Sequence, residues 1–389
     1  MPGELLIRHA RIYTPLTIID NGFIYIKEGI IKDVGSEPCP IKCSNIINAE
    51  DLIVAPGFID THIHGYKGYD SNDCKPESFL EISKLITRHG VTAFIPSTVT
   101  ASHETLLEAS KAVYEAIKSW NGGGARILGL HLEGPYISKE KRGAQNPEYI
   151  RPASRQELRE YIKASNNHIR QITVAPEAPG VIDLIPYAVE NEITVSIGHT
   201  NASYEETRKA IEAGASKATH LYNAMKSIHH REPGPIIALL ENPGVYIELI
   251  TDFIHVSKPM VKFTIDYAGY ERIVLITDAI SATMLPDGKY SLGGLDVIVE
   301  KGVPRLASTH ALAGSTLTMD KAVRNVYSLG YSLQQVLSMA TLNPAKSIHA
   351  IYREKIGLIK PGFKADIVFL DENLEVVKTM VEGELVYEK

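Results

Sequence analysis

Cysteine is scarce in this chain: Cys39, Cys43 and Cys74 are the only three among 389 residues. An odd and sparse set argues against a disulfide framework and fits a reducing cytoplasm, where we expect the protein to work. Long hydrophobic runs are also missing. None approaches the ~20 residues that span a bilayer, so we expect no membrane partner. The first residues lack the basic region and apolar stretch of a signal peptide.

Charge of one sign is not concentrated anywhere. The 40 Lys and Arg residues and the 46 Asp and Glu residues give a formal net charge of −6, spread without long blocks. A general nucleic-acid-binding protein would present a basic face, so we expect no nucleic-acid partner. A chain of this length can bury a large core, and it suits two or three domains or one large barrel with an accessory domain.

Short β-like runs at both ends of the chain predict one small β-sandwich domain. Strands are expected at 5–13, at 22–34 as two strands about a Glu28-Gly29 turn, at 365–370 and at 376–387. Neither end is long enough to form a sheet by itself. We therefore expect residues 1–54 and 354–389 to combine, with the middle of the chain inserted between them.

The middle of the chain, 55–353, alternates short apolar runs with amphipathic stretches. The expected strands are 58–62, 92–96, 127–132, 171–175, 193–197, 217–220, 245–250 and 273–277. The helical patterns between them include 76–89, 103–120, 155–166, 202–214 and 257–267. Eight strands alternating with helices predict an α/β fold, a (β/α)8 TIM barrel.

Histidines and carboxylates fall at the carboxyl ends of these expected strands. In a parallel barrel those ends form one rim, which is where barrel enzymes have their active sites. Such side chains are the ligands of Zn²⁺ or Fe²⁺, so we expect a divalent metal, one or two per chain. The candidate ligands are His62, His64, Glu133, His199, His220 and Asp278.

His62 and His64 give the strongest local signal. Alternate side chains of an extended strand face the same way, so both imidazoles can chelate one ion. His199 and His220 are one strand–helix–strand step apart and are expected on neighbouring strands. The alternative for these two is a pair of core or rim histidines that bond to the backbone. We interpret His131 as structural or supporting rather than as a ligand.

Two further groups could take part in the chemistry. Glu133 ends a buried strand and needs a cation or several donors, and its two oxygens could bridge two metals. Asp278 could be a ligand and a proton shuttle, or instead a helix cap. Asn223, Ala224 and Arg231 offer an amide, a backbone N–H and a guanidinium that would suit a phosphate, although a loop arginine is usually solvated.

The motifs as a series carry a specific resemblance. The segment 56–65, PGFIDTHIHG, resembles the first-strand signature of the amidohydrolase superfamily. The later motifs resemble, in order, those of its N-acetylglucosamine-6-phosphate deacetylase family. They are HLEGPY at 131–136, GHT at 198–200, THLYNAM at 219–225, REPG at 231–234, TDA at 277–279 and LAGSTLTM at 312–319.

The resemblance implies an amidohydrolase-type barrel with a small β-sandwich, usually as a homodimer. It implies metal-dependent hydrolysis of N-acetyl-D-glucosamine 6-phosphate, a phosphorylated amino sugar, to D-glucosamine 6-phosphate and acetate in amino-sugar catabolism and cell-wall recycling. The implied roles cover the whole candidate site. The principal metal would be held by Glu133, His199 and His220, and a second metal, bridged by Glu133, would be held by His62 and His64. Asp278 would be the catalytic acid/base. The phosphate would be bound by Asn223, Ala224 and Arg231, and His255 would contact the sugar or acetamide.

Some details stay open at this point. Gln145 stands where some relatives have histidine, and it can donate a hydrogen bond to the sugar or the acetyl oxygen but cannot act as an acid. Arg231 could serve its own site or that of a neighbouring subunit. Rival functions are deacetylation of N-acetylgalactosamine 6-phosphate, hydrolysis of cyclic amides without a phosphate requirement, and a catalytically silent metal-binding barrel.

Overall fold

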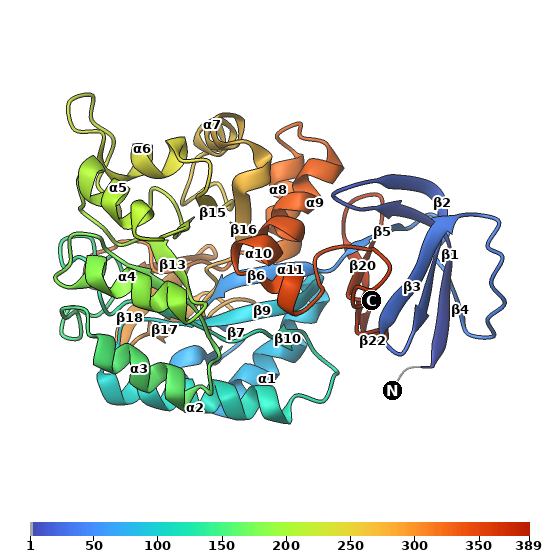
Figure 1. The fold of residues 1–389 in the computed structure, drawn as a ribbon, viewed down its shortest axis with the longest axis horizontal. Helices are drawn as coiled ribbons and strands as arrows, with labels where there is room; N and C mark the ends of the chain where they lie inside the picture. Colours follow the sequence, from blue (N-terminus) through green and yellow to red (C-terminus); the bar gives the residue numbers. More distant parts are fainter. Residues whose placement is uncertain (1–2) are drawn as a thin grey trace.

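The two ends of the chain meet in one sheet in the computed structural model, which describes residues 3–389 (Figure 1). The strands run in the order β22-β21-β20-β5-β1-β2-β3, and β4 pairs with β1. Their bounds are β1 (Glu4–Tyr13), β2 (Ile18–Lys27), β3 (Ile30–Ser36), β4 (Ile46–Asn48), β5 (Ile53–Pro56), β20 (Ile367–Leu370), β21 (Val376–Val381) and β22 (Glu384–Glu388). The sheet curls back on itself, because β3 hydrogen-bonds to residues 362–365 just before β20. It thereby encloses a small core that includes Ile7, Ile24 and Phe369.

The middle of the chain forms a parallel barrel. Its pairing runs β10-β9-β11-β12-β13-β14-β15-β16, with β6 beside β9. The strands are β6 (Phe58–Ile63), β9 (Val91–Thr98), β10 (Arg126–Ile127), β11 (Leu130–Glu133), β12 (Ile169–Val174), β13 (Thr194–Ile197), β14 (Lys217–Ala218), β15 (Tyr246–Ile250) and β16 (Ile273–Ile276). The barrel closes just beyond β16, where Asp278 N donates to His62 O at 2.9 Å and His64 N donates to Ala279 O at 2.8 Å. The predicted fold class is confirmed.

Helices cover the outside of the barrel (Figure 1). They are α1 (Pro76–Leu85), α2 (His103–Ser119), α3 (Arg155–Ala164), α4 (Val181–Glu190), α5 (Tyr204–Glu212), α6 (Gly234–Glu241), α7 (Lys258–Ala268), α8 (Met319–Tyr327), α9 (Leu333–Ala340), α10 (Leu342–Ser347) and α11 (Ala350–Arg353), with 3-10 turns η1 (Ser71–Asp73), η2 (Ile86–His89) and η3 (Tyr270–Arg272). On α2 the residues Leu106, Ala109, Val113 and Ala116 are buried at helical spacing. A capping box of Ser203 and Glu206 starts α5. Within residues 3–389, no helix has the length and apolar character needed to cross a membrane.

Several features differ from the sequence prediction. The third strand is broken into β10 and β11 by Leu128-Gly129, and a side chain at Gly129 would meet His168 O at 2.3 Å. An additional antiparallel sheet, β17 (Gly288–Leu292), β18 (Leu295–Glu300) and β19 (Val303–Leu306), follows the barrel strands. Its first turn is Gly293-Gly294, with φ of 55° and 81°. This is a recognised hairpin signal that the sequence interpretation left unused. A short hairpin of β7 (Gly65–Tyr66) and β8 (Tyr69–Asp70) follows β6.

A buried ion pair joins the barrel to the sheet of the chain ends. Arg126 in β10 donates to Asp366 Oδ2 at 3.4 Å and to Glu382 Oε1 at 2.7 Å. The Arg126 and Asp366 side chains are only 9% and 3% exposed. Removing the guanidinium would leave the Asp366 carboxylate buried without its counter-charge.

We expect Arg126→Met to lower the free energy of unfolding by about 3–5 kcal/mol, which is typical for breaking a buried ion pair. Lys84→Met is the matched control, because Lys84 pairs with Glu81 on the exposed face of α1. The control should change stability by less than about 1 kcal/mol. Urea unfolding followed by fluorescence measures both, and equal effects would contradict a role for this junction.

Candidate metal centre

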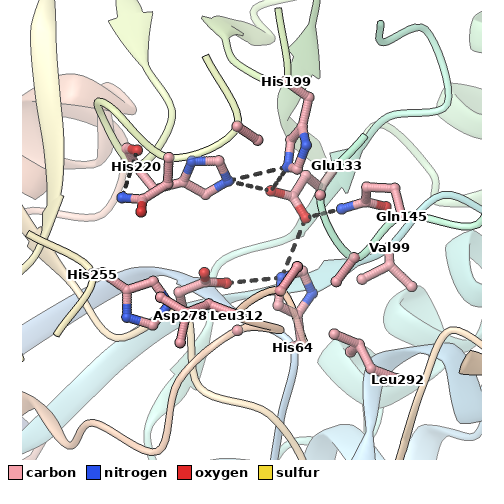
Figure 2. A pocket seen from close by; sticks show the side chains of 16 residues that line it. His64, Val99, Glu133, Gln145, His199, His220, His255, Asp278, Leu292 and Leu312 are labelled. Atoms are coloured by element: carbon pink, nitrogen blue, oxygen red, sulfur yellow. Dashed lines mark hydrogen bonds and ion pairs between the residues drawn. The ribbon is translucent and has the colours of Figure 1, made fainter. Parts of the chain in front are cut away.

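The candidate ligands lie at or just beyond the carboxyl ends of barrel strands. His62 lies in β6 and Glu133 ends β11, whereas His199, His220 and Asp278 each follow their strand by two residues. These last three have left-handed backbones, with φ of 46°, 29° and 52°. Such a conformation costs a non-glycine residue about 1–3 kcal/mol and is typical of functional sites. In Figure 2 the side chains of Glu133, His199, His220 and Asp278 converge on one pocket, together with His64.

Glu133, His199 and His220 form one group of potential ligands. Glu133 Oε1 lies 3.1 Å from His199 Nε2 and 3.0 Å from His220 Nε2, and the two imidazole nitrogens are 3.1 Å apart. Ligands of a tetrahedral zinc with bonds of 2.0–2.1 Å are separated by about 3.3 Å. The three atoms therefore have nearly the spacing that one divalent ion requires.

His62, His64 and Asp278 form a second group. The two Nε2 atoms are 3.3 Å apart, and Asp278 Oδ1 lies 3.0 Å from His64 Nε2 and 3.5 Å from His62 Nε2. Glu133 links the two groups, because its other oxygen, Oε2, lies 3.3 Å from His64 Nε2. The arrangement matches the sequence expectation of two adjacent sites with Glu133 between them.

The hydrogen bonds of His64 and His199 direct their Nε2 atoms into the cluster, where each can bind a cation. His64 Nδ1 contacts Ser97 O at 2.9 Å and His199 Nδ1 contacts Lys141 O at 3.0 Å. A carbonyl oxygen only accepts, so each Nδ1 donates and each Nε2 is the nitrogen available to a metal ion. Imidazole nitrogens and carboxylate oxygens this close together need a proton or a metal ion between them. This donor set fits a divalent metal ion.

The carboxylates of the cluster are held ionised by the imidazoles. Burial would raise the pKa of Glu133, but the neighbouring His62 and His199 outweigh it and hold that pKa well below its usual range. The pKa of Asp278 is also lowered: burial opposes the shift, and His62 and His64 outweigh burial. Both groups are thus in the form that binds a metal and accepts a proton.

His131 lies outside both ligand groups. It is fully buried between Ser97 Oγ at 2.9 Å and Thr173 Oγ1 at 2.8 Å, and burial lowers its pKa well below the usual value. A neutral, doubly hydrogen-bonded imidazole agrees with a supporting role in the barrel interior.

Gln145 lines the pocket and contacts a candidate metal ligand. Its Nε2 donates to Glu133 Oε2 at 2.5 Å, and its Oε1 accepts from Thr100 N at 2.6 Å. Gln145 therefore orients Glu133. The hydrogen bond to the sugar or the acetyl oxygen that the sequence suggested would use the second N–H of this amide, and it stays a prediction.

His255 lines the pocket beside Asp278 (Figure 2). Its Nδ1 lies 2.6 Å from Asp252 Oδ2, so Asp252 fixes the ring. The sequence analysis missed Asp252, although a carboxylate three residues before a histidine and two residues after a strand is a usable signal. It also missed Lys217 and Glu248, two charged residues within apolar barrel strands.

The three candidate phosphate ligands are not all in the pocket. Asn223 and Ala224 line it, and Ala224 has a left-handed backbone with φ of 52°. Arg231 is exposed in the loop that projects between β14 and α6, and its guanidinium donates to His230 Nε2 at 2.7 Å. Within the single chain described, residues 3–389, Arg231 does not line the pocket. The remaining lining residues are His64, Val99, Glu133, Gly143, Ala144, Gln145, His199, His220, His255, Asp278, Leu292, Ala311, Leu312 and Gly314.

The fold and the site together define a class: a parallel α/β barrel with a candidate metal centre at its carboxyl rim. Comparisons with known proteins agree. The amidohydrolase family model matches residues 53–386. An N-acetylgalactosamine-6-phosphate deacetylase of Escherichia coli O157:H7 is 36% identical, covering 98% of both chains. An N-acetylglucosamine-6-phosphate deacetylase of Vibrio furnissii is 37% identical, covering 86% of this chain and 82% of its own.

A solved structure also shows similarity to a sugar-phosphate deacetylase. A mutant of N-acetyl-D-glucosamine-6-phosphate deacetylase from Mycobacterium smegmatis, in complex with N-acetyl-D-glucosamine-6-phosphate, superimposes with a TM-score of 0.92. It is 34% identical and is matched over 99% of this chain and 100% of its own. The chain belongs to the amidohydrolase family. The family is metal-dependent, in agreement with the two ligand groups within the described residues.

We expect the double change His62→Gln/His64→Asn to remove one metal ion and to keep the ion held by Glu133, His199 and His220. Three ligands plus water complete a tetrahedral site, so activity should fall partially rather than vanish. Elemental analysis paired with kinetics measures both effects. Loss of all metal would instead assign the principal ion to His62 and His64.

Proposed function

We propose that this protein hydrolyses the acetamide of N-acetyl-D-glucosamine 6-phosphate, giving D-glucosamine 6-phosphate and acetate. The observation that carries the proposal is the pocket itself, in which Asp278, a member of one of two adjacent metal-ligand groups, lines the cavity together with His255 and Asn223. Nearly full-length similarity to sugar-phosphate deacetylases, one of them bound to this sugar phosphate, supports the choice of substrate.

The proposed cofactor is zinc or iron, with one or two ions per chain. Glu133, His199 and His220 would hold the principal ion, and His62, His64 and Asp278 the second. A bound divalent ion activates water for attack and polarises a carbonyl oxygen.

The side chains of the pocket perform the proton transfers. Asp278 accepts the proton of the attacking water at its carboxylate and delivers it to the leaving amine nitrogen. His255, held by Asp252, contacts the sugar or the acetamide oxygen, and a correctly placed donor at a developing oxyanion is typically worth about 10²–10³ in rate. Gln145 keeps Glu133 oriented throughout.

We also propose that the protein is a homodimer in which Arg231 reaches the partner's pocket. The loop that carries Arg231 projects away from the barrel between α5 and α6 (Figure 1). On α7 the rings of Phe263 and Tyr267 stack, and both side chains are about half exposed. An exposed aromatic surface and a basic loop support a contact between subunits in which Asn223, Ala224 and the incoming Arg231 bind the phosphate.

The proposed domains correspond to the two parts of the fold. Residues 55–353 would be the catalytic domain, and residues 1–54 with 354–389 an accessory β-sandwich domain. The proposed setting is cytoplasmic amino-sugar catabolism and cell-wall recycling.

A second candidate is N-acetylgalactosamine 6-phosphate as the substrate. The E. coli O157:H7 relative named for that reaction is matched over 98% of both chains, which specifically favours it. The two sugars differ at one hydroxyl group.

Acetate release from both sugars, each with and without the 6-phosphate, tests the proposal. We expect N-acetylglucosamine 6-phosphate to have the highest kcat/KM. Higher turnover of the galacto isomer would select the second candidate, and equal rates without phosphate would contradict both.

We expect Asp278→Asn to lower kcat by at least about 10³, because the carboxylate that moves the proton is lost. The ion held by Glu133, His199 and His220 should remain bound, and elemental analysis provides that control. A variant with more than a tenth of the wild-type kcat would remove Asp278 from the mechanism.

We expect Arg231→Ala to act mainly through KM, since the phosphate is remote from the bond that breaks. One lost charge-assisted contact corresponds to about 1.5–3 kcal/mol in kcat/KM. Lys226→Ala, in the same loop region but paired with Glu232, is the control. Unchanged discrimination between phosphorylated and unphosphorylated sugar in the Arg231 variant would show that this assignment is wrong.

A further inference from the structure

A buried ion pair lies inside the barrel beneath the candidate metal centre, and the proposed reaction gives it no role. Lys217 begins β14 and Glu248 lies in β15, and both side chains are 0% exposed. Lys217 Nζ lies 2.8 Å from Glu248 Oε1. Lys217 also donates to Thr61 Oγ1 and Gln171 Oε1, each at 2.9 Å. All three partners of the ammonium are therefore side chains of the barrel interior.

The second oxygen of Glu248 faces the metal-ligand cluster. Glu248 Oε2 lies 3.1 Å from His62 Nδ1 and 3.3 Å from His220 N. An ionised carboxylate only accepts hydrogen bonds, so His62 Nδ1 is the donor and Nε2 is directed at His64 and Asp278. One oxygen of Glu248 thus binds Lys217, while the other fixes the direction of the His62 ring.

The support of His62 differs from that of its neighbours. His64 and His199 direct their Nδ1 atoms to the backbone oxygens of Ser97 and Lys141. Among the imidazoles of the two ligand groups, within residues 3–389, His62 is the one whose Nδ1 contacts a carboxylate. A backbone partner is present in any sequence that folds, whereas a carboxylate partner depends on the side chain at one position.

Stability alone gives no reason for this arrangement. A buried ion pair is often no more stabilising than two apolar side chains of similar volume, because both charges lose their hydration. The placement of this pair against a metal-ligand histidine supplies a different reason, since outer partners of ligand histidines fix the ring and raise its basicity.

We propose that Glu248, held in place by Lys217, is a positioning residue that fixes His62 and thereby sets the affinity of the second metal site. The inference rests on the proposed function only in assuming that this site takes a divalent ion. Its readout is the bound ion, so a wrong choice of sugar substrate would leave the test unaffected.

Two double variants separate positioning from structural support. Lys217→Met/Glu248→Leu, the apolar double variant, removes both charges and the acceptor for His62. Lys217→Met/Glu248→Gln, the amide double variant, removes both charges but keeps an amide oxygen as acceptor. Arg126→Met is the matched control, because it breaks a buried ion pair at the junction of the barrel and the end sheet, away from the rim. Metal-free protein is dialysed against buffered free Zn²⁺ over a range of concentrations, and bound zinc per chain is measured by elemental analysis.

We expect the wild type to bind two zinc ions per chain in two steps. The apolar double variant should keep the first step and weaken the second by at least about tenfold, as is typical when the partner of a ligand histidine is lost. The amide double variant should recover most of the second step, and Arg126→Met should leave both steps unchanged.

Several results would overturn the proposal. They are a wild-type second step in the apolar double variant, equal losses in the two double variants, equal weakening of both steps, or a similar shift in Arg126→Met. A wild type that binds a single ion would leave no second site for Glu248 to set, and it would contradict the two-metal arrangement as well. Thermal unfolding of each metal-free variant verifies that the compared proteins are folded.

Discussion

The structure depends above all on one constraint: the carboxylates buried at the barrel rim need positively charged partners close to them. Glu133 and Asp278 are almost completely buried, and so are the four imidazoles around them. Burial without counter-charges would push such carboxylates toward their neutral forms. Here the neighbouring histidines lower both carboxylate pKa values. The same crowding places imidazole nitrogens against each other, which a divalent ion relieves. The cluster is therefore balanced electrostatically in a way that an apolar core could not provide.

The hydrogen bonds that close the barrel also bring together residues of the candidate metal centre. The hydrogen bonds that join the segment after β16 to β6 are made by the backbones of Asp278, Ala279, His62 and His64. The first and last strands of the barrel therefore bring the His62–His64 pair and Asp278 together through their own backbones. The left-handed turns at His199, His220 and Asp278 are tolerated because the surrounding strands fix these positions.

The side chains of the pocket are supported by residues outside the two ligand groups. Gln145, in the loop after β11, orients Glu133 and is itself held by the backbone of Thr100. Asp252 orients His255. Such contacts restrict each ligand to one orientation, which is the requirement for a site that must act without reorganising.

The sequence by itself determined much of the architecture and most of the site. Period-two and helical patterns, with the Glu28-Gly29 turn, were sufficient for the barrel strands and for the strands of both chain ends except β4 and β5. His62, His64, Glu133, His199, His220 and Asp278 were identified because they end apolar runs, and strand ends share a rim in any parallel barrel. Local patterns contain this information, since periodicity and strand termini depend on neighbouring residues.

Only the tertiary structure decided which atoms meet. In the folded chain Gln145 contacts Glu133, and Arg231 lies outside the pocket of its own chain. Lys217 pairs with Glu248, which contacts His62. These contacts join residues that are 12 to 186 positions apart. Their geometry depends on how adjacent strands align, on left-handed turns at non-glycine residues and on the packing of side chains inside the barrel. Those quantities are set by the whole fold, because no short segment contains both partners of such a contact.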